Sequence, residues 1–176
     1  DYCSENYDVD GETVSVSETL GSYESLSVGS KNIAIWQSEE ELNLGRVTTV
    51  DLKLTPGPLG SRRNGGIVLN YREHANISGR FVYHVVDVDY DTQTLSIKKF
   101  DGLTYIILAS TPILSIYTDR WFRLIATVVE GPVAGQTSLS ARLLDLEGSL
   151  DVSPAAVLTS NYAPSTGFNG VIADRA

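Results

Sequence analysis

The sequence predicts an all-β protein in which two antiparallel sheets pack face to face as a sandwich. Short runs of β-branched and aromatic residues recur along the 176-residue chain, and Gly, Pro, Asn and Asp separate them, which is typical of strands joined by turns. No stripe of apolar residues with helical spacing extends over a useful length. Single β-sandwich domains commonly reach this size, and such a domain can bury a core without disulfide bonds.

The expected strands follow one another from the N-terminus. Residues 1–20 are polar and acidic, so we interpret them as a lead-in segment or edge strand with one candidate strand at residues 12–16, and we assign residues 21–176 to the sandwich. Further strands are expected at residues 32–37, 47–55, 66–72, 81–90, 95–100, 105–109, 121–129 and 139–146. Turn signals such as the Pro-Gly-rich residues 56–60 separate them. We find no linker that would divide the chain into two domains.

Residues 81–100 predict a β-hairpin whose pairing follows from its hydrophobic pattern. With Thr92 and Gln93 at the tip, the apolar residues of both strands fall on one face, and Asp87 lies directly opposite Lys98 on the other. The apolar face consists of Val86, Val88, Tyr90, Leu95 and Ile97. A slip of one residue would scatter these side chains over both faces, so we expect the apolar face to be buried and the Asp face to be exposed.

Several motifs resemble one known group of sandwich domains. A Gly-Gly-Ile-Val-Leu-Asn-Tyr-Arg strand at residues 65–72 leads to the hairpin, a later strand opens with Trp-Phe-Arg-Leu at residues 121–124, and another ends in an acidic residue and Gly at residues 143–148. This order resembles the concanavalin A-like jelly rolls of the laminin G-like type. The resemblance implies a jelly-roll sandwich with Trp121 in the core, and we expect Trp36 to be buried too. It implies no activity, because lectins, adhesion modules, lyases and glycosidases share this fold.

The resemblance also bears on the C-terminus. In the resembled fold one more strand follows the last Gly-hydrophobic turn and closes the sheet, whereas here residues 168–174 are followed by two residues only. We therefore expect an open sheet edge at residues 171–174, which would recruit another strand. Either residues 12–16 cover that edge, or a strand from another chain or from a segment outside these residues does so. We favour the second, which predicts assembly through an open sheet edge.

The charge of the chain argues against two classes of partner. The net charge is −9, and only four residues are Lys. An acidic surface repels the phosphate backbone of nucleic acids and anionic lipid headgroups. No run approaches the roughly 20 apolar residues that a membrane-spanning helix requires. We therefore expect neither nucleic acid binding nor membrane insertion.

Two residues bear on the cellular compartment. Cys3 is the single cysteine, and it is either a free thiol or half of a disulfide bond to a segment outside these residues, which would fit an oxidising compartment. Asn76 opens the one N-glycosylation sequon, in a polar stretch where a loop is expected. We expect an extracellular or cell-surface protein. Because the chain starts at Asp1 and contains no Met, we also expect a processed or truncated end.

The pattern of carboxylates disfavours an enzyme. Retaining glycosidases need two carboxyl groups about 5 Å apart, and the resembled glycosidases carry them in a Glu-x-Asp-x-x-Glu strand that is absent here. Glu39, Glu40 and Glu41 are consecutive and cannot all face one cleft from a strand, so we interpret them as an acidic turn. The Gln-x-His and Tyr-x-Lys strands of alginate-lyase relatives are absent as well. A polysaccharide lyase or hydrolase remains the second alternative function.

Asp87, Asp89 and Asp91 raise the question of a calcium site. Their spacing resembles the start of an EF-hand loop, but no Gly follows and Lys98 stands where that loop has Glu. Carboxylates on one face of a strand are about 6.5–7 Å apart, which is too far for one ion with ligands at about 2.4 Å. We expect no cofactor and interpret the carboxylates as an exposed strand face. Calcium at Asp91, helped by loop carbonyls, is the alternative.

Two groups of residues are better suited to binding a ligand. Arg62 and Arg63 lie in a Gly-bounded loop at residues 60–65, and guanidinium groups form bidentate contacts with carboxylate or sulfate. Aromatic and hydrogen-bonding side chains of the kind that sugars need come next in the sequence: Tyr71, Arg72, His74, Tyr83 and Tyr105. Ordinary solvation of the Arg pair and packing of the tyrosines are the alternative interpretations.

The sequence therefore favours a non-catalytic extracellular binding module whose ligand is a glycan or an acidic polysaccharide. Arg62 and Arg63 would contact anionic groups, while Tyr71 and Tyr105 would stack on sugar rings. The alternative is a structural or adhesion subunit of a cell-surface or extracellular assembly, in which the partner is a neighbouring protein chain. The polar N-terminal segment with its unpaired Cys3 favours that alternative.

Overall fold

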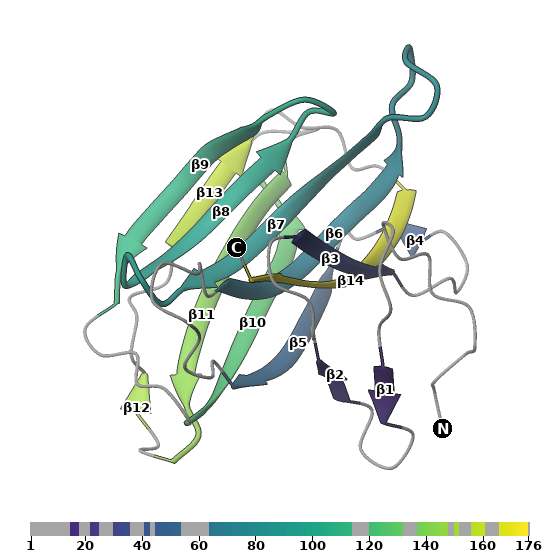
Figure 1. Ribbon diagram of the computed structural model, residues 1–176. Helices are drawn as coiled ribbons and strands as arrows, with labels where there is room; N and C mark the ends of the chain where they lie inside the picture. The colour runs from purple at the N-terminus through teal and green to yellow at the C-terminus, as the bar shows by residue number, and fades with distance from the viewer. Residues whose placement is uncertain are drawn as a thin grey trace.

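The computed structural model shows an all-β chain (Figure 1). It describes residues 15–17, 22–24, 30–35, 41–42, 45–53, 64–113, 120–131, 137–147, 150–151, 156–160 and 166–175. Within these residues every regular element is a strand. The same part of the chain contains no helix long and apolar enough to cross a membrane.

The larger sheet has seven strands, all paired in antiparallel fashion. Its order is β3 (Ser30–Ile35), β14 (Thr166–Arg175), β6 (Asn64–Glu73), β7 (Phe81–Asp89), β8 (Thr94–Phe100) and β9 (Tyr105–Pro112), and β4 (Glu41–Leu42) also pairs with β14. The early strand β3 and the last strand β14 thus lie next to each other, and β6 separates them from the hairpin of β7 and β8.

The second sheet has five antiparallel strands. Its order is β12 (Leu150–Asp151), β11 (Thr137–Asp145), β10 (Trp121–Glu130) and β5 (Arg46–Lys53), and β13 (Ala156–Ser160) also pairs with β11. A separate two-stranded sheet joins β1 (Ser15–Ser17) and β2 (Ser22–Glu24). The predicted two-sheet antiparallel sandwich is therefore confirmed.

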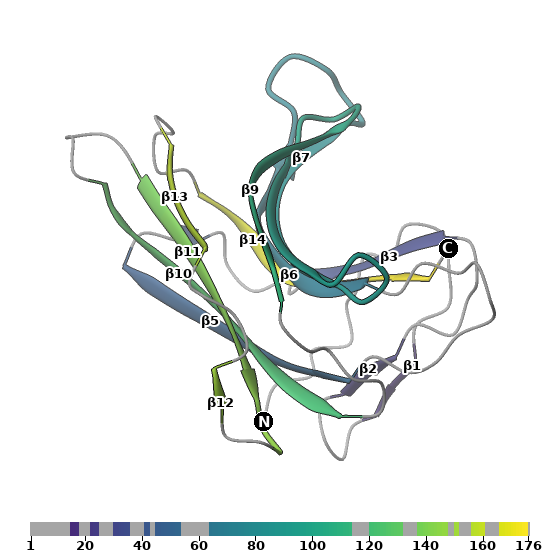
Figure 2. The same cartoon turned by 90° about the vertical axis from the view of Figure 1, so that its left-hand side faces the viewer.

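The two large sheets differ in shape. Figure 2 shows that β6, β7, β8 and β9 are strongly curved, with their convex face toward β5, β10 and β11 and their concave face turned away from them. Twist and curvature of this kind are normal in antiparallel sheets, and bulges increase them. The strand register shifts once between β6 and β7 and once between β8 and β9, as it does at bulges. The seven-stranded sheet therefore has two faces with different surroundings.

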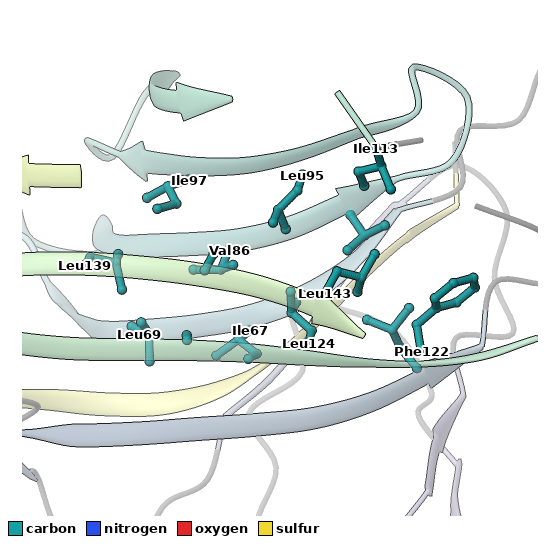
Figure 3. Close-up of a cluster of buried hydrophobic side chains, with 14 of the residues drawn as sticks. Ile67, Leu69, Val86, Leu95, Ile97, Ile113, Phe122, Leu124, Leu139 and Leu143 are labelled. Atoms are coloured by element: carbon teal, nitrogen blue, oxygen red, sulfur yellow. The ribbon is translucent and has the colours of Figure 1, made fainter. Parts of the chain in front are cut away.

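A core of aliphatic side chains fills the space between the convex face and the second sheet (Figure 3). The seven-stranded sheet contributes Ile67, Leu69, Val86, Val88, Leu95 and Ile97, and the other sheet contributes Leu52, Phe122, Leu124, Ala126, Val128, Leu139, Ala141 and Leu143. Along β10 the buried residues alternate with exposed or half-buried ones, as expected of a strand with one face on the core.

This alternation overturns the expectation for Trp121, which is not a core residue. Its side chain is 45% exposed, while Phe122 next to it is fully buried. Successive side chains of a strand point to opposite faces, so a core that contains Phe122, Leu124 and Ala126 leaves Trp121 on the outer face of the second sheet. The other tryptophan, Trp36, lies outside the described residues.

The hairpin of β7 and β8 has the predicted faces but not the predicted register. Val88 pairs with Leu95, and Val86 pairs with Ile97, so every residue of β7 pairs two positions away from its expected partner. A shift by two residues keeps each side chain on its face. The four residues are therefore buried in the core as expected, although their partners were wrong.

Turn chemistry explains the shift. The chain reverses over four residues, 90–93, between the ends of β7 and β8, and Gln93 adopts a left-handed conformation with φ of 51°. The Asp89 carboxylate accepts hydrogen bonds from the backbone N–H groups of Asp91 and Thr92, at 2.9 and 3.0 Å. This side-chain cap stabilises the longer turn.

The opposite face of the hairpin also differs from expectation. Asp87 lies opposite Ser96 and not opposite Lys98, but the long Lys98 side chain reaches it diagonally, and the ion pair measures 2.6 Å. Asp87 is buried, whereas an exposed carboxylate was expected. The face that carries Asp87 is thus partly buried, and it forms the candidate site described below.

The expectation of an open edge at the C-terminus is wrong. Residues 170–175 pair with β3 on one side, and residues 168–174 pair with β6 on the other. The neighbour comes from residues 30–35, whereas residues 15–17 pair with β2. Because β14 is paired on both sides, the argument for assembly through this edge no longer holds.

Candidate functional site

The concave face of the seven-stranded sheet carries a second apolar cluster, separate from the core between the sheets. Val68, Tyr83, Val85 and Ile172 are buried there, from β6, β7 and β14. Half-buried aromatic residues pack against them: Tyr71, Phe100 and Tyr105. No sheet of the described part of the chain is stacked on this face, which opens away from β5, β10 and β11 (Figure 2). Such a face is the place where side chains can meet a ligand.

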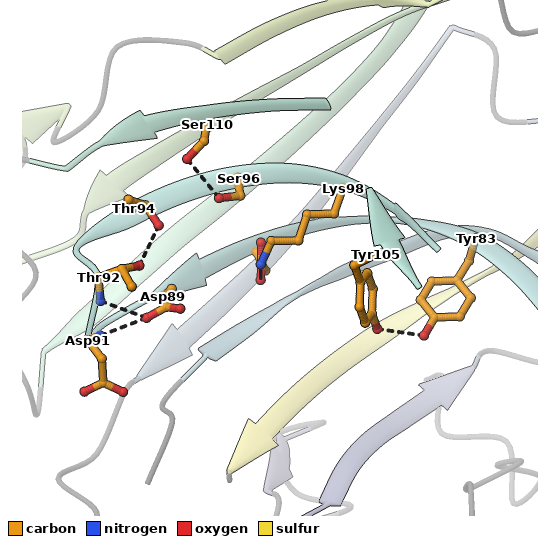
Figure 4. A network of polar contacts seen from close by, with 10 residues as sticks. Tyr83, Asp89, Asp91, Thr92, Thr94, Ser96, Lys98, Tyr105 and Ser110 are labelled. Atoms are coloured by element: carbon orange, nitrogen blue, oxygen red, sulfur yellow. Dashed lines mark hydrogen bonds and ion pairs between the residues drawn. The ribbon is translucent and has the colours of Figure 1, made fainter. Parts of the chain in front are cut away.

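Five rings form a continuous aromatic cluster at one end of this face, namely Tyr71, Phe81, Tyr83, Phe100 and Tyr105. Tyr71 stacks on Phe81 and on Tyr83, with ring centroids 4.8 and 5.5 Å apart. Phe100 lies 5.0 Å from both Tyr83 and Tyr105. The hydroxyls of Tyr83 and Tyr105 form a hydrogen bond of 2.8 Å (Figure 4). The structure thus brings together Tyr71 and Tyr105, two residues that the sequence analysis selected.

A bulge in β6 places Tyr71 in the cluster. Regular alternation would put Tyr71, three residues after Val68, on the core face. Instead the register shifts between Leu69 and Arg72, and Asn70 adopts a left-handed conformation with φ of 58°. Asn tolerates that conformation better than most residues. The bulge therefore turns the Tyr71 ring onto the concave face beside Val68.

The strand next to this bulge is adapted to it. A Cβ atom on Gly167 of β14 would lie 2.7 Å from the backbone carbonyl carbon of Asn70, so only Gly fits there. The backbone N–H of Asn70 donates to Oδ1 of Asn169, at 3.4 Å. The register of β14 against β6 shifts at this point as well. Two adjacent irregular strands thus hold the end of β6 that carries Tyr71.

The rim of the aromatic cluster is accessible. Phe81 is 36% exposed at the start of β7. Ile107 on the edge strand β9 is 64% exposed, and it is the cross-strand neighbour of Lys98. The buried Tyr83 lies in the middle of the cluster, and its less buried neighbours surround it. A ligand would therefore contact the rings at the rim and rest on those at the centre.

Asp87 and Lys98 form an ion pair in the middle of the concave face. Oδ2 of Asp87 lies 2.6 Å from Nζ of Lys98, and the two side chains are 6% and 19% exposed. Burial raises the pKa of Asp87 above its ordinary value, while Lys98 and the Asn64 side chain oppose that rise. A buried carboxylate needs such partners, since an isolated buried charge is costly.

One oxygen of Asp87 has no donor in the described part of the chain. Its Oδ1 atom and Oδ1 of Asn64 are both buried without a hydrogen-bond partner there. Turning the Asn64 amide by 180° would point its N–H groups toward the carboxylate, which agrees with the lowering effect of Asn64 on the Asp87 pKa. Lys98 therefore holds the Asp87 side chain from β8, and the Asn64 amide of β6 lies within reach of its other oxygen.

Hydroxyl groups continue the polar part of the face toward the hairpin turn (Figure 4). The Ser96 and Ser110 hydroxyls lie 3.2 Å apart on β8 and β9, and those of Thr92 and Thr94 lie 2.8 Å apart. The concave face thus has an aromatic end, an ion pair in its middle and a hydroxyl-rich end. Among the described residues, this arrangement combines apolar ring surface with hydrogen-bonding groups on a single face.

Arg72 and His74 do not join the aromatic cluster. Arg72 pairs with Val82 and lies near His84, on the other face of β7. His74 lies in the turn between β6 and β7, where its Nδ1 accepts a hydrogen bond from the backbone N–H of Asn76, at 3.1 Å. The structure therefore places these two selected residues beside the candidate site and not in it.

A buried histidine, His84, lies on that other face. Burial, together with the nearby charges of Lys99 and Arg72, lowers its pKa from 6.5 to about 4. The imidazole is therefore neutral at physiological pH. Because it is turned away from the concave face, we assign it no role in the candidate site.

The remaining selected residues are only partly placed. Asp91 is exposed in the turn between β7 and β8, and Asn76 is exposed in the turn between β6 and β7. Among the described residues, no group of three His, Cys, Asp or Glu side chains could hold a metal ion. Calcium at Asp91 and glycosylation of Asn76 stay predictions. Cys3, Arg62 and Arg63 lie outside the described residues.

Sequence reasoning missed Phe81 and Phe100 as parts of the site. A signal for them was present, because Phe100 is the cross-strand partner of Tyr83, and Phe81 is two positions before it. Aromatic residues two apart on one strand and opposite a third must share a face. The apolar alternation of the hairpin marks its core face, and this aromatic set lies on the opposite face.

The sheets and this face define a β-sandwich protein with an aromatic and polar concave surface. No family model matches the chain, and no curated protein matches its sequence significantly. Among solved structures, the chain is similar to the carbohydrate-binding module CBM66 from Bacillus subtilis, with a TM-score of 0.64 and 12% sequence identity over 96% of this chain and 88% of that one. At this identity the likeness shows the fold, a β-sandwich.

Two peptidase structures overlap less well. One is SCP-B, a member of the eqolisin family, with a TM-score of 0.41 and 11% identity over 82% of this chain and 62% of that one. The other is scytalido-glutamic peptidase, with a TM-score of 0.37 and 13% identity over 76% and 61%. Overlaps of this size carry no weight for the function of this chain.

Proposed function

We propose that this protein is a non-catalytic carbohydrate-binding module that holds a glycan on the concave face of its seven-stranded sheet. The aromatic cluster carries the proposal. It presents the accessible rims of Tyr71, Phe81 and Tyr105 on a face on which no described sheet is stacked. The likeness of the fold to a carbohydrate-binding module supports it.

The chemistry of these rings suits a sugar. A tyrosine combines an apolar ring face with a polar hydroxyl and loses little conformational freedom on binding because it has few rotatable bonds. Sugars present C–H groups on one face of the ring and hydroxyls around its edge. Tyr105 would stack on a C–H face, while Tyr71, whose ring already stacks on Phe81 and on Tyr83, would contact the sugar with its edge. The hydroxyls of Tyr83 and Tyr105, which already bond to each other at 2.8 Å, would mark the polar boundary.

The finer parts of the proposal rest on the sequence. The resemblance to laminin G-like domains leads us to place the protein outside the cell or on its surface. Arg62 and Arg63, which precede β6 in the sequence, would extend the site toward a longer glycan. The alternative of a structural or adhesion subunit loses the support of an open sheet edge, because β14 is paired on both sides.

A glycan array, probed with and without calcium, tests the proposal. We expect binding to a defined class of glycans, and we expect Tyr105→Ala to weaken it about tenfold or more, as truncation of an aromatic anchor does. Trp121→Ala is the matched control, because Trp121 is an exposed aromatic residue on the outer face of the other sheet. It should leave binding unchanged.

Two results would contradict this function. One is the absence of binding to any glycan in both conditions. The other is a loss that Trp121→Ala causes as strongly as Tyr105→Ala does. Release of reducing ends or of unsaturated products from a polysaccharide panel would instead support the lyase or hydrolase alternative.

A further inference from the structure

Among the described side chains of β6, β7, β8 and β9, the proposed binding face contains one cation, and its surroundings are unusual. Lys98 lies on β8 with its side chain 19% exposed, next to the exposed Ile107 of the edge strand. An ammonium group has three N–H donors. Asp87 accepts one of them, at 2.6 Å, and it is the sole partner of Lys98 within the described residues. Two donors therefore remain for a ligand.

The position of this ammonium group is fixed. Asp87 comes from the neighbouring strand β7, is itself nearly fully buried, and has the Asn64 amide of β6 within reach of its carboxylate. A lysine on a surface would lose side-chain entropy when a ligand orders it. Here the ion pair has already restricted Lys98 before a ligand arrives, so its donors are presented in a defined place.

The charge of this ammonium group is also cancelled. Asp87 brings a negative charge to within 2.6 Å, and Asp89 adds another on the same face of β7. The described charged side chains of β7 and β8 on this face are therefore two carboxylates and one ammonium group. Hydroxyls of Ser96, Ser110 and Thr94 add uncharged polar groups there. This described part of the surface therefore offers hydrogen bonds but no net positive charge to attract an anion.

From this geometry, and resting on the proposed carbohydrate-binding function, we infer that Asp87 positions and neutralises Lys98 so that the concave face selects neutral, hydroxyl-rich sugars and rejects anionic ones. Lys98 donates to sugar hydroxyl oxygens, and Asp87 prevents the same donors from capturing a carboxylate or sulfate. Asp87 acts through Lys98, so it is a positioning residue. This selectivity differs from the acidic polysaccharide that the Arg62 and Arg63 pair suggested.

The test compares oligosaccharides of equal length by calorimetry at low salt. Cellohexaose, mannohexaose and laminarihexaose are the neutral probes, and hexagalacturonate and hexaguluronate are the anionic ones. The wild type should bind at least one neutral probe about tenfold or more tightly than either anionic probe. Asp87→Asn should release the Lys98 charge and raise the affinity for the anionic probes about tenfold, and added salt should remove this gain.

A matched control separates this effect from the overall charge of the protein. Asp91→Asn changes the net charge by the same amount at an exposed position in the hairpin turn, and it should leave the preference for neutral probes unchanged. If Asp87→Asn does not fold, Lys98→Gln decides: it should weaken neutral binding about tenfold and leave anionic binding at or below the wild-type level. Thermal unfolding of every variant verifies the fold.

Each outcome has a definite meaning. A wild-type preference for the anionic probes would overturn this inference and leave the carbohydrate-binding function standing. Equal effects of Asp87→Asn and Asp91→Asn would also overturn it, because the effect would then be that of net charge. If the wild type binds no probe of either kind and no glycan on the array, the proposed function itself fails.

Discussion

The two faces of the seven-stranded sheet use the same strands for opposite purposes. On the convex face, Ile67, Val86 and Ile97 are fully buried under the second sheet. On the concave face, the residues one position away include Val68, Val85 and Asp87, and aromatic rings pack against the cluster that contains the two valines. A strand alternates its side chains, so adjacent residues of one strand belong to a dry core and to a candidate ligand surface.

The difference lies in what each face tolerates. The convex face contains aliphatic side chains that fill space and make no hydrogen bonds. The concave face keeps an ion pair in which Asp87 is nearly fully buried, although hydrophobic residues in such places are often as stable or more so. Polar groups retained at that cost indicate a role other than stability, which agrees with a binding face.

The largest contrast should appear in the free energy of unfolding. Phe122→Ala removes a fully buried ring from the core between the sheets, and we expect a loss of about 3–5 kcal/mol. Phe81→Ala removes a ring that is 36% exposed on the concave face, and we expect a much smaller loss. Urea denaturation of both variants measures this. Equal losses would mean that the concave rings are structural core.

The pH dependence of stability should report on the convex side. The folded-state pKa of His84 is lowered to about 4 from 6.5, so its contribution is complete above pH 6.5 and is lost as the pH falls toward 4. We expect a loss of about 3 kcal/mol over that window. Between pH 6.5 and pH 4, the free energy of unfolding from urea denaturation should change less with pH for His84→Gln than for the wild type. Parallel pH profiles would show that His84 is not buried in its neutral form.

A single Cβ atom should disturb the junction of β6 and β7. On Gly66 it would lie 2.2 Å from the carbonyl oxygen of Val86 and 2.8 Å from Cα of Asp87. We expect Gly66→Ala to cost about 2 kcal/mol or more through overpacking and to weaken glycan binding by moving Asp87. Gly45→Ala, at a turn with open space around it, should leave binding unchanged. Unaltered stability of Gly66→Ala would refute the close approach of these strands.

The smallest effect distinguishes one ion pair of the second sheet from the pair of Asp87 and Lys98. Arg123 and Asp51 form a two-pronged pair of 2.7 and 2.8 Å on the outer face of the second sheet, where both are exposed. Exposed pairs contribute little and are screened by salt. In double-mutant cycles we expect the coupling energy of Arg123 and Asp51 to vanish in about 1 M salt. The coupling energy of Asp87 and Lys98 should persist, because that pair is mostly buried. If salt weakens the coupling of Asp87 and Lys98 as much as that of Arg123 and Asp51, the Asp87–Lys98 pair is exposed to solvent and not buried.

Much of the sandwich was readable from hydrophobic alternation. The apolar residues of the hairpin, such as Val88 and Leu95, were assigned to the correct face because side-chain periodicity in strands is strict. Their register was not, because it depends on a four-residue turn with a left-handed Gln93 and a cap from Asp89. The resemblance predicts Trp121 in the core, whereas alternation with the buried Phe122 places it on the outer face, where it lies.

The candidate site was less predictable than the fold. Tyr71 and Tyr105 were selected for their chemistry, but their proximity depends on a bulge at Asn70 that no periodic pattern indicates. The last strand, β14, pairs with β3, so that Gly170 lies opposite Ile35, more than a hundred positions away in the sequence. Local sequence patterns carry no information on such pairings. The ion pair of Asp87 and Lys98 was anticipated but its burial was not, because alternation alone places the polar side chains of the hairpin on an exposed face.

The claim that a glycan binds the concave face can be tested most directly by nuclear magnetic resonance. A ¹⁵N-labelled sample is titrated with cellohexaose, mannohexaose or laminarihexaose, whichever binds most tightly, and the shifted backbone amides are mapped. We expect the shifts to gather around Tyr71, Phe81, Lys98 and Tyr105, with little change around Trp121 and Arg123. Shifts centred on Trp121 and the outer face of the second sheet would contradict the proposed site.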